Sequence, residues 1–167
     1  MELYILRHGI AVEPGTPGYE KDADRPLTPE GERKLGQIAK AMEALELSFD
    51  LILSSPYRRA QQTAEIIAAG LKARKKLELC DSLTPGGSTT KVVELLNHLR
   101  PCPESVLLVG HEPYLSGLIS LLVSGKEHLG VVMKKGGLCK LSTESLKHGR
   151  CATLDWLLTP KQMALMS

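Results

Sequence analysis

Three short apolar runs in this sequence each lead into side chains that can do chemistry. In chain order these are Arg7 and His8 after the run 3–6, Arg58 and Arg59 after the run 51–53, and His111 after the run 106–109. Arginine offers a planar fork of donors that matches phosphate oxygens, and a neutral imidazole is a competent nucleophile near neutral pH. Since phosphoryl transfer needs mainly positioning and charge stabilisation, these residue types together indicate phosphoryl chemistry.

The elements that must position these residues follow from the apolar pattern. Continuous apolar runs of this length are typical of strands covered on both faces. Between them, apolar residues recur at helical spacing over residues 35–45, 92–99 and 115–122. This alternation predicts an α/β fold, a three-layer sandwich with a mainly parallel central sheet and helices on both faces. Two later runs, 137–142 and 152–158, are expected to pair as a hairpin that adds antiparallel edges.

Ligands of such sheets bind outside the carboxyl ends of the strands, so the histidines and one arginine are expected to converge on one rim. Pro56 is expected to begin a helix on which Arg58 shares a polar face and Arg59 lies nearer the buried face. We therefore assign Arg59, rather than Arg58, to the site. Gly9 and Gly110, which adjoin the two histidines, are expected to let the backbone turn sharply.

The segment between the first run and the first helix reads as a loop. Residues 9–27 are rich in glycine, proline and charge, and loops of that length are usually functional or mobile. Thr28, Pro29 and Glu30 are typical of a helix start, with a hydroxyl cap, a proline at the first helical position and an acid near the positive end. We expect the first long helix to begin here.

Composition indicates an ordinary globular protein. The chain has 167 residues, which fits one domain over residues 1–167. The net charge of +2 is too small to imply a nucleic-acid partner. No stretch approaches the roughly 20 apolar residues that a membrane helix needs, and the first residues do not form a signal peptide. We therefore expect no membrane partner and a cytoplasmic location.

The four cysteines form no C-x-x-C pair, so they give little support to a zinc site. In a reducing compartment all four are expected to be free thiols. Cys139 lies on the first late run and Cys151 directly precedes the second, so a hairpin of these runs would allow the two to face each other.

Several ordered motifs resemble those of the histidine phosphatase superfamily, also called phosphoglycerate mutase-like. Residues 6–9 resemble its R-H-G signature, 55–63 its S-P-x-x-R-A-x-Q-T segment, and 109–113 its second-histidine segment. Residues 25–31 resemble the segment that opens its first long helix. The short length, the Arg-Pro-Leu-Thr segment and residues 83–87 are most similar to the SixA-type phosphohistidine phosphatases.

The resemblance implies a role for each site residue and a single histidine phosphatase domain over residues 1–167. It implies that His8 is the nucleophile that becomes phosphorylated, that Arg7, Arg59 and His111 hold the phosphoryl oxygens, and that no cofactor or metal takes part. In the expected mechanism, neutral His8 attacks phosphorus in line while Arg7, Arg59 and a protonated His111 neutralise the oxygens. Water then hydrolyses the phospho-His8 intermediate. The neighbouring positive groups are expected to keep His8 unprotonated.

Mutase-like members carry a glutamate general acid in the stretch that corresponds to residues 81–87, where this sequence has no clear counterpart. Glu112 is either a proton donor, as in another branch of the superfamily, or a cap for the following helix, which we favour. An alkoxide leaving group needs protonation, since the pKa of water is about 15.7. Imidazole leaves more easily, since its conjugate acid has a pKa of about 6.5. We therefore expect the substrate to be phosphohistidine on a protein in signal transduction.

Two other functions stay open at this point. The first is a phosphatase for small-molecule phosphate esters, and the second is a phosphate-binding domain without catalysis. Lys134 and Lys135 either approach the rim of the site or are simply solvated, which we favour.

Overall fold

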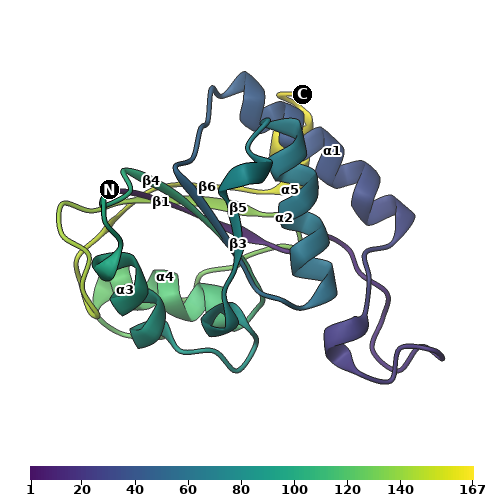
Figure 1. Cartoon of the computed structure of the whole chain (residues 1–167), viewed down its shortest axis with the longest axis horizontal. Coiled ribbons are helices and arrows are strands. Elements are labelled where there is room, and N and C mark those ends of the chain that lie inside the picture. Colours follow the sequence, from purple (N-terminus) through teal and green to yellow (C-terminus); the bar gives the residue numbers. More distant parts are fainter.

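The computed structural model describes residues 1–167 and places a six-stranded sheet at the centre of the molecule (Figure 1). The strands are β1 Glu2–Arg7, β2 Leu51–Ser54, β3 Leu77–Leu79, β4 Ser105–Gly110, β5 Leu138–Ser142 and β6 Thr153–Leu158. Their order across the sheet is β3-β2-β4-β1-β5-β6. The first four in this order pair in parallel, whereas β5 is antiparallel to both β1 and β6. The expected mainly parallel sheet with a late antiparallel hairpin is confirmed.

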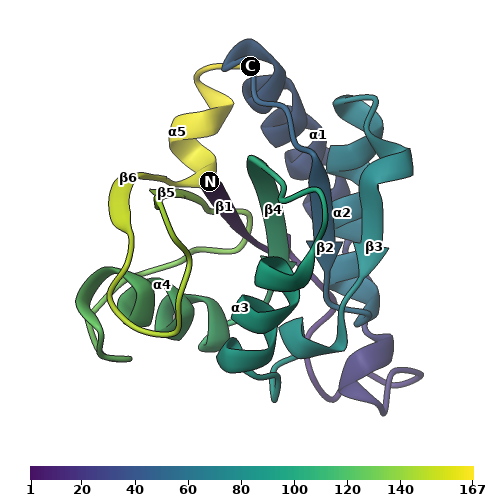
Figure 2. The same ribbon diagram turned by 60° about the vertical axis from the view of Figure 1, so that its left-hand side comes forward.

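Helices cover both faces of this sheet. They are α1 Pro29–Ala44, α2 Arg58–Gly70, α3 Thr89–His98, α4 Tyr114–Ser124 and α5 Pro160–Ala164, with three short 3₁₀ turns, η1 Asp22–Asp24, η2 Arg74–Lys76 and η3 Asp81–Leu83. One face carries α1, α2 and α5, and the other carries α3 and α4 (Figures 1 and 2). The three-layer arrangement expected from the sequence is therefore confirmed. None of these helices combines the length and apolar character that crossing a bilayer requires.

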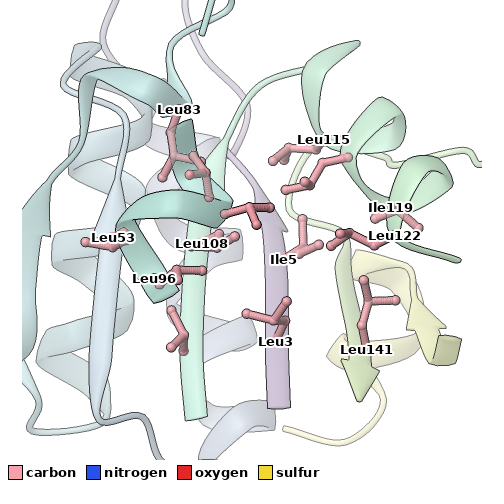
Figure 3. Packing of buried hydrophobic residues seen from close by; sticks show 14 of the residues in the cluster. Leu3, Ile5, Leu53, Leu83, Leu96, Leu108, Leu115, Ile119, Leu122 and Leu141 are labelled. Atoms are coloured by element: carbon pink, nitrogen blue, oxygen red, sulfur yellow. The ribbon is translucent and has the colours of Figure 1, made fainter. Parts of the chain in front are cut away.

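The core consists of two apolar layers, one on each side of the sheet. Along β1, Leu3 and Ile5 pack toward α3 and α4, while Tyr4 and Leu6 pack toward α1 and α2. Figure 3 shows the first of these layers, in which leucines and an isoleucine of α4 meet the side chains of β1 and β4. Because full burial of one such side chain stabilises a fold by roughly 1.5–3 kcal/mol, the strands that end at the site are firmly held.

The start of α1 agrees with the prediction from the sequence, whereas the start of α2 does not. Thr28 caps α1 as expected, since its Oγ1 accepts a hydrogen bond from Gly31 N at 3.0 Å. The expected start of α2 at Pro56 is wrong, because the helix begins at Arg58. The hydroxyl of Ser55 accepts from Tyr57 N at 3.2 Å, and this local turn occupies the residues before the helix.

Other differences concern the later part of the chain. The strand β3 was not predicted, since it has only three residues and lies half exposed at the edge of the sheet. On α3, Leu95 is 41% exposed instead of buried, and Val93 takes its place in the core. All four cysteines are free, as expected, but Cys139 and Cys151 do not face each other. Cys139 pairs with Leu157 across the hairpin, and Cys151 precedes β6.

Candidate active site

Three neighbouring strands end at the same level and bring their following residues together. The backbone N–H of His8 donates to Gly110 O at 3.0 Å, so the ends of β1 and β4 are joined. Likewise Ser55 N donates to Val109 O at 3.0 Å, which joins the ends of β2 and β4. The rings of His8 and His111 are consequently only 5.1 Å apart between centroids. The expected convergence of the two histidines on one rim is confirmed.

The hydrogen bonds of His8 define its tautomer. Its Nδ1 lies 2.7 Å from Gly9 O, and a carbonyl oxygen can only accept, so the ring proton is on Nδ1. Its Nε2 accepts a hydrogen bond from Arg59 Nε at 3.3 Å. The imidazole is 5% exposed. His8 therefore presents the lone pair of Nε2, on the side of the ring where Arg59 lies.

Both site histidines are neutral near pH 7. Burial, with smaller contributions from the positive groups around it, lowers the pKa of His8 to about 3. Burial and then the charge of Arg59 lower the pKa of His111 to about 3 as well. A neutral His8 was expected, although burial outweighs the neighbouring charges as the cause. In the free site His111 is neutral as well, because desolvation disfavours the imidazolium, while the expected protonated His111 concerns the site with a phosphoryl group bound and stays a prediction.

Two buried donors at the site have no partner in the protein. The Nε2 atom of His111 lies 2.8 Å from Ser55 Oγ, which also accepts from the backbone of residue 57. We assign the Ser55 hydroxyl proton to His111 Nε2, because the protein offers that hydroxyl no other acceptor, and this assignment leaves the ring proton on Nδ1. That Nδ1 and the Nε of Arg7 are buried without any hydrogen-bond partner. Since unpaired buried donors cost free energy, an anion with several oxygens would stabilise them.

Arg7 is further held by the segment before β5. Its Nη1 donates to Met133 O at 2.8 Å, which fixes the guanidinium beside the end of β1. Burial lowers the pKa of Arg7, and the negative charge of Glu112 opposes that shift. A guanidinium stays protonated in proteins, so Arg7 brings a positive charge into the site.

Arg59 is the arginine of α2 that enters the site, as expected from its position on the helix. It is 3% exposed, whereas Arg58 points into solvent. Its guanidinium carbon lies 5.3 Å from the centre of the Tyr57 ring, a cation–π distance. Its Nη1 and Nη2 donate to the backbone oxygen and the carboxylate of Asp22, at 2.7 and 3.0 Å.

Asp22 is a residue of the site that the sequence analysis missed. It lies in η1, 37 residues before Arg59, and it also accepts hydrogen bonds from Arg25 at 2.7 and 2.9 Å. Burial raises its pKa, but the hydrogen bonds from Arg25 and Arg59 keep the pKa below the ordinary value. Asp22 is thus an ionised carboxylate that orients Arg59. No spacing in the sequence indicates this contact, because it depends on how the loop 9–27 folds back.

The two glycines beside the histidines have a different role from the one expected. Neither Gly9 nor Gly110 has a positive φ, so neither is needed for a sharp turn. Instead, a Cβ at Gly9 would lie 2.7 Å from Leu35 Cδ1, and one at Gly110 would lie 3.2 Å from Leu115 Cδ2. The glycines allow the helices to approach the strand ends closely. The expectation of sharp turns is therefore wrong, and close packing is the reason for glycine here.

Glu112 serves the helix that follows it. Its Oε1 accepts a hydrogen bond from Ser116 N at 2.8 Å, in the first turn of α4. A carboxylate at this place satisfies a free N–H and complements the positive end of the helix. The interpretation of Glu112 as a cap is confirmed.

Comparisons with known proteins identify the family of this chain. Residues 3–84 match the family described as histidine phosphatase superfamily (branch 1). The phosphohistidine phosphatase SixA of Escherichia coli is 30% identical over 161 residues, covering 96% of this chain and 94% of that protein. An uncharacterized protein of Picosynechococcus is 37% identical over 142 residues, covering 84% of each chain.

A solved structure gives the same answer for the fold. The structure of the protein histidine phosphatase SixA complexed with tungstate superposes with a TM-score of 0.83 at 25% identity, covering 96% of this chain and 98% of that one. Similarity over nearly the full length of both chains, in sequence and in structure, shows that this chain belongs to the histidine phosphatase superfamily as a SixA-type member.

Proposed function

We propose that this chain is a phosphohistidine phosphatase, acting as a single domain over residues 1–167, in which His8 is the nucleophile. One observation carries the proposal. A buried, neutral imidazole offers its Nε2 lone pair beside two buried donors, Arg7 Nε and His111 Nδ1, that lack partners. These are the groups that an attack on a phosphoryl group needs, a nucleophile and donors for the oxygens.

The proposed reaction has two steps. In the first, His8 Nε2 attacks phosphorus in line on a phosphohistidine whose ring carries a proton on its other nitrogen. The bond from phosphorus to the substrate nitrogen breaks, its electron pair stays with that nitrogen, and the substrate histidine leaves as a neutral imidazole. Arg7, Arg59 and His111 donate to the three oxygens, which requires Arg59 Nε to move from His8 Nε2. The carbonyl of Gly9 holds the Nδ1 proton and so stabilises the positive charge that phosphorylation puts on the ring. In the second step, water attacks phosphorus, the bond from phosphorus to His8 Nε2 breaks with its electron pair returning to Nε2, and inorganic phosphate leaves with the water proton, which restores neutral His8.

The charges in this mechanism come from the protein itself. Two guanidinium groups and the donor of His111 neutralise the phosphoryl oxygens, so no metal or cofactor is needed for the proposed steps. The arriving phosphoryl dianion also favours a positive His111, since an opposite charge nearby raises the pKa of an imidazole.

A phosphohistidine substrate fits the carboxylates around the site. Glu112 is bound to the start of α4, and Asp22 is held ionised by two arginines, so both are poorly placed to protonate a leaving group. An imidazole can leave without such help, whereas an alkoxide cannot. The relatives named phosphohistidine phosphatase SixA support the same substrate class. We propose a phosphohistidine-bearing signalling protein as the partner, and a cytoplasmic location, which the four free thiols fit.

The test compares hydrolysis of a phosphohistidine peptide with that of a panel of small phosphate esters. Wild type and His8→Ala are measured side by side, with circular dichroism to show that the variant folds. We expect rapid loss of phosphohistidine that depends on His8, a ³²P-labelled His8 intermediate, and weak ester turnover. Fast ester turnover at low concentration would instead indicate a small-molecule phosphatase. Phosphate binding without a labelled intermediate would indicate a non-catalytic domain.

A further inference from the structure

A groove beside the site is lined by positive side chains and by no acid. It has a volume of about 670 Å³ and lies between α1, the segment 134–135 before β5, and the start of α5. Its positive residues, which together we call the lysine groove, are Arg7, Lys34, Lys134, Lys135 and Lys161. This is a strong local concentration of charge in a chain whose net charge is only +2.

Part of this positive charge is not neutralised by the protein. Lys34 forms an ion pair with Glu30 at 2.8 Å, and Lys135 approaches Glu13 at 3.9 Å, both outside the groove. Lys134 and Lys161 have no carboxylate within ion-pair distance, and Lys134 is exposed. Lys134 is thus solvated, as favoured from the sequence, and both Lys134 and Lys135 also line the groove together with Arg7.

The remaining lining residues suggest the kind of ligand. Ile10, Pro160 and Ala164 contribute apolar surface to the lining, and Gln37 and Thr159 contribute polar groups. A single phosphate ion fills only a small part of a volume in the range of roughly 300–1,000 Å³ that holds larger ligands. A segment of polypeptide offers apolar side-chain groups that can contact the apolar lining residues and carboxylates that can pair with the lysines. It therefore matches the whole lining.

Arg7 connects this groove to the phosphoryl site. Its Nε is one of the two unpaired donors there, and its Nη1 binds Met133 O, directly before Lys134 in the chain. Helices α1 and α5 pack against each other (Figure 2), and residues of both helices line the groove together with Arg7 at the end of β1. A protein whose phosphohistidine reaches His8 therefore has its neighbouring residues over the lysine groove.

We propose that the lysine groove binds an acidic segment of the phosphohistidine-bearing protein, and that carboxylates near the phosphohistidine select the substrate. This inference rests on the proposed function and adds a substrate preference to it. Exposed charges of this kind steer association and make it dependent on salt, since the Debye length is about 10 Å at 0.1 M ionic strength.

The test uses two synthetic phosphohistidine peptides of equal length, one with aspartate and glutamate around the phosphohistidine and one with serine there. For wild type at low salt we expect kcat/KM to be about tenfold higher for the acidic peptide. Each exposed ion pair contributes little, but a few of them together give a ratio of this size. The ratio should fall toward one in 0.5 M salt. In the double variant Lys134→Glu and Lys161→Glu the ratio should fall to one or reverse.

A matched control changes the same number of charges elsewhere. The double variant Lys75→Glu and Lys91→Glu alters two exposed lysines, in η2 and on α3, away from the lysine groove, and should keep the wild-type ratio. Equal turnover of both peptides by wild type would overturn the groove inference and leave the phosphatase function standing. A preference for the acidic peptide that persists in the double variant Lys134→Glu and Lys161→Glu would also overturn the groove inference. Failure of wild type to hydrolyse either peptide would instead overturn the proposed function, and the groove inference with it.

Discussion

The buried histidine pair makes the stability of the folded protein depend on pH between 7 and 5. In the fold, His8 and His111 have pKa values of about 3. In the unfolded chain an exposed histidine has a pKa of about 6.5. The unfolded state therefore binds more protons below pH 6.5. It follows that the stabilisation is fully present above that pH and is lost progressively as the pH falls toward 3.

The size of this effect follows from the same values. At pH 5 each histidine is about 1.5 pH units below its unfolded pKa, and each unit corresponds to about 1.36 kcal/mol. Between pH 7 and pH 5, each histidine should thus lower the free energy of unfolding by about 2 kcal/mol, and the pair should lower it by about 4 kcal/mol. Domains of this size are stable by about 5–15 kcal/mol, so the loss is readily measured.

The assay is urea unfolding followed by circular dichroism at pH 7.0 and pH 5.0. Wild type is compared with the double variant His8→Asn and His111→Asn, which keeps polar side chains but removes both titrating groups. The other histidines and the carboxylates are common to both proteins, so the difference between the two pH-dependent losses isolates the buried pair. If wild type loses no more stability than the variant, the two imidazoles are not held neutral by burial and the reasoning fails.

Three further predictions concern single side chains around the nucleophile. Arg59→Ala should lower kcat/KM for a phosphohistidine peptide by about 10²- to 10³-fold, whereas Arg58→Ala at an exposed position should stay near wild type in the same kinetic assay. Ser55→Ala should lower kcat by about tenfold with little change in KM, because His111 loses the hydrogen-bond partner that fixes its tautomer. The ¹⁵N chemical shifts of the His111 ring should report the change of tautomer. Glu112→Gln keeps an oxygen for the start of α4, so it should retain phosphohistidine turnover within a few fold and lose about 0.5 kcal/mol in urea unfolding. Loss of turnover of both phosphohistidine and an aryl phosphate would identify Glu112 as a proton donor after all.

The arrangement of the central strands could be predicted because each carries a clear pattern. The segments that became β1, β2 and β4 are short runs of apolar residues, buried on both faces as such runs are expected to be. Parallel pairing then places their carboxyl ends together, which predicts that His8 and His111 meet. The strand β3 gave no comparable signal, because its three residues alternate around a glutamate at an exposed edge.

The details that control the chemistry could not be predicted in the same way. The contact between Asp22 and Arg59 joins a loop to a helix, and no periodic pattern describes a loop. The hydroxyl of Ser55 belongs to a recognisable motif, but its bond to His111 depends on the register of β2 and β4. The extent of desolvation depends on all the elements that surround a side chain, which is why the sequence suggested neighbouring charges as the main reason for a neutral His8.

The value of burying His8 lies in positioning rather than in its protonation state. An exposed histidine with a pKa of about 6.5 is already about three-quarters neutral at pH 7, so a pKa of about 3 increases the neutral fraction by less than half. Burial instead fixes the proton on Nδ1 through Gly9 O and keeps water away from the Nε2 lone pair. In that dry setting the charges of Arg7 and Arg59 act on a phosphoryl group more strongly than they would in water. The stability that the protein loses at low pH is therefore the consequence of a site built to orient a neutral nucleophile next to fixed positive charge.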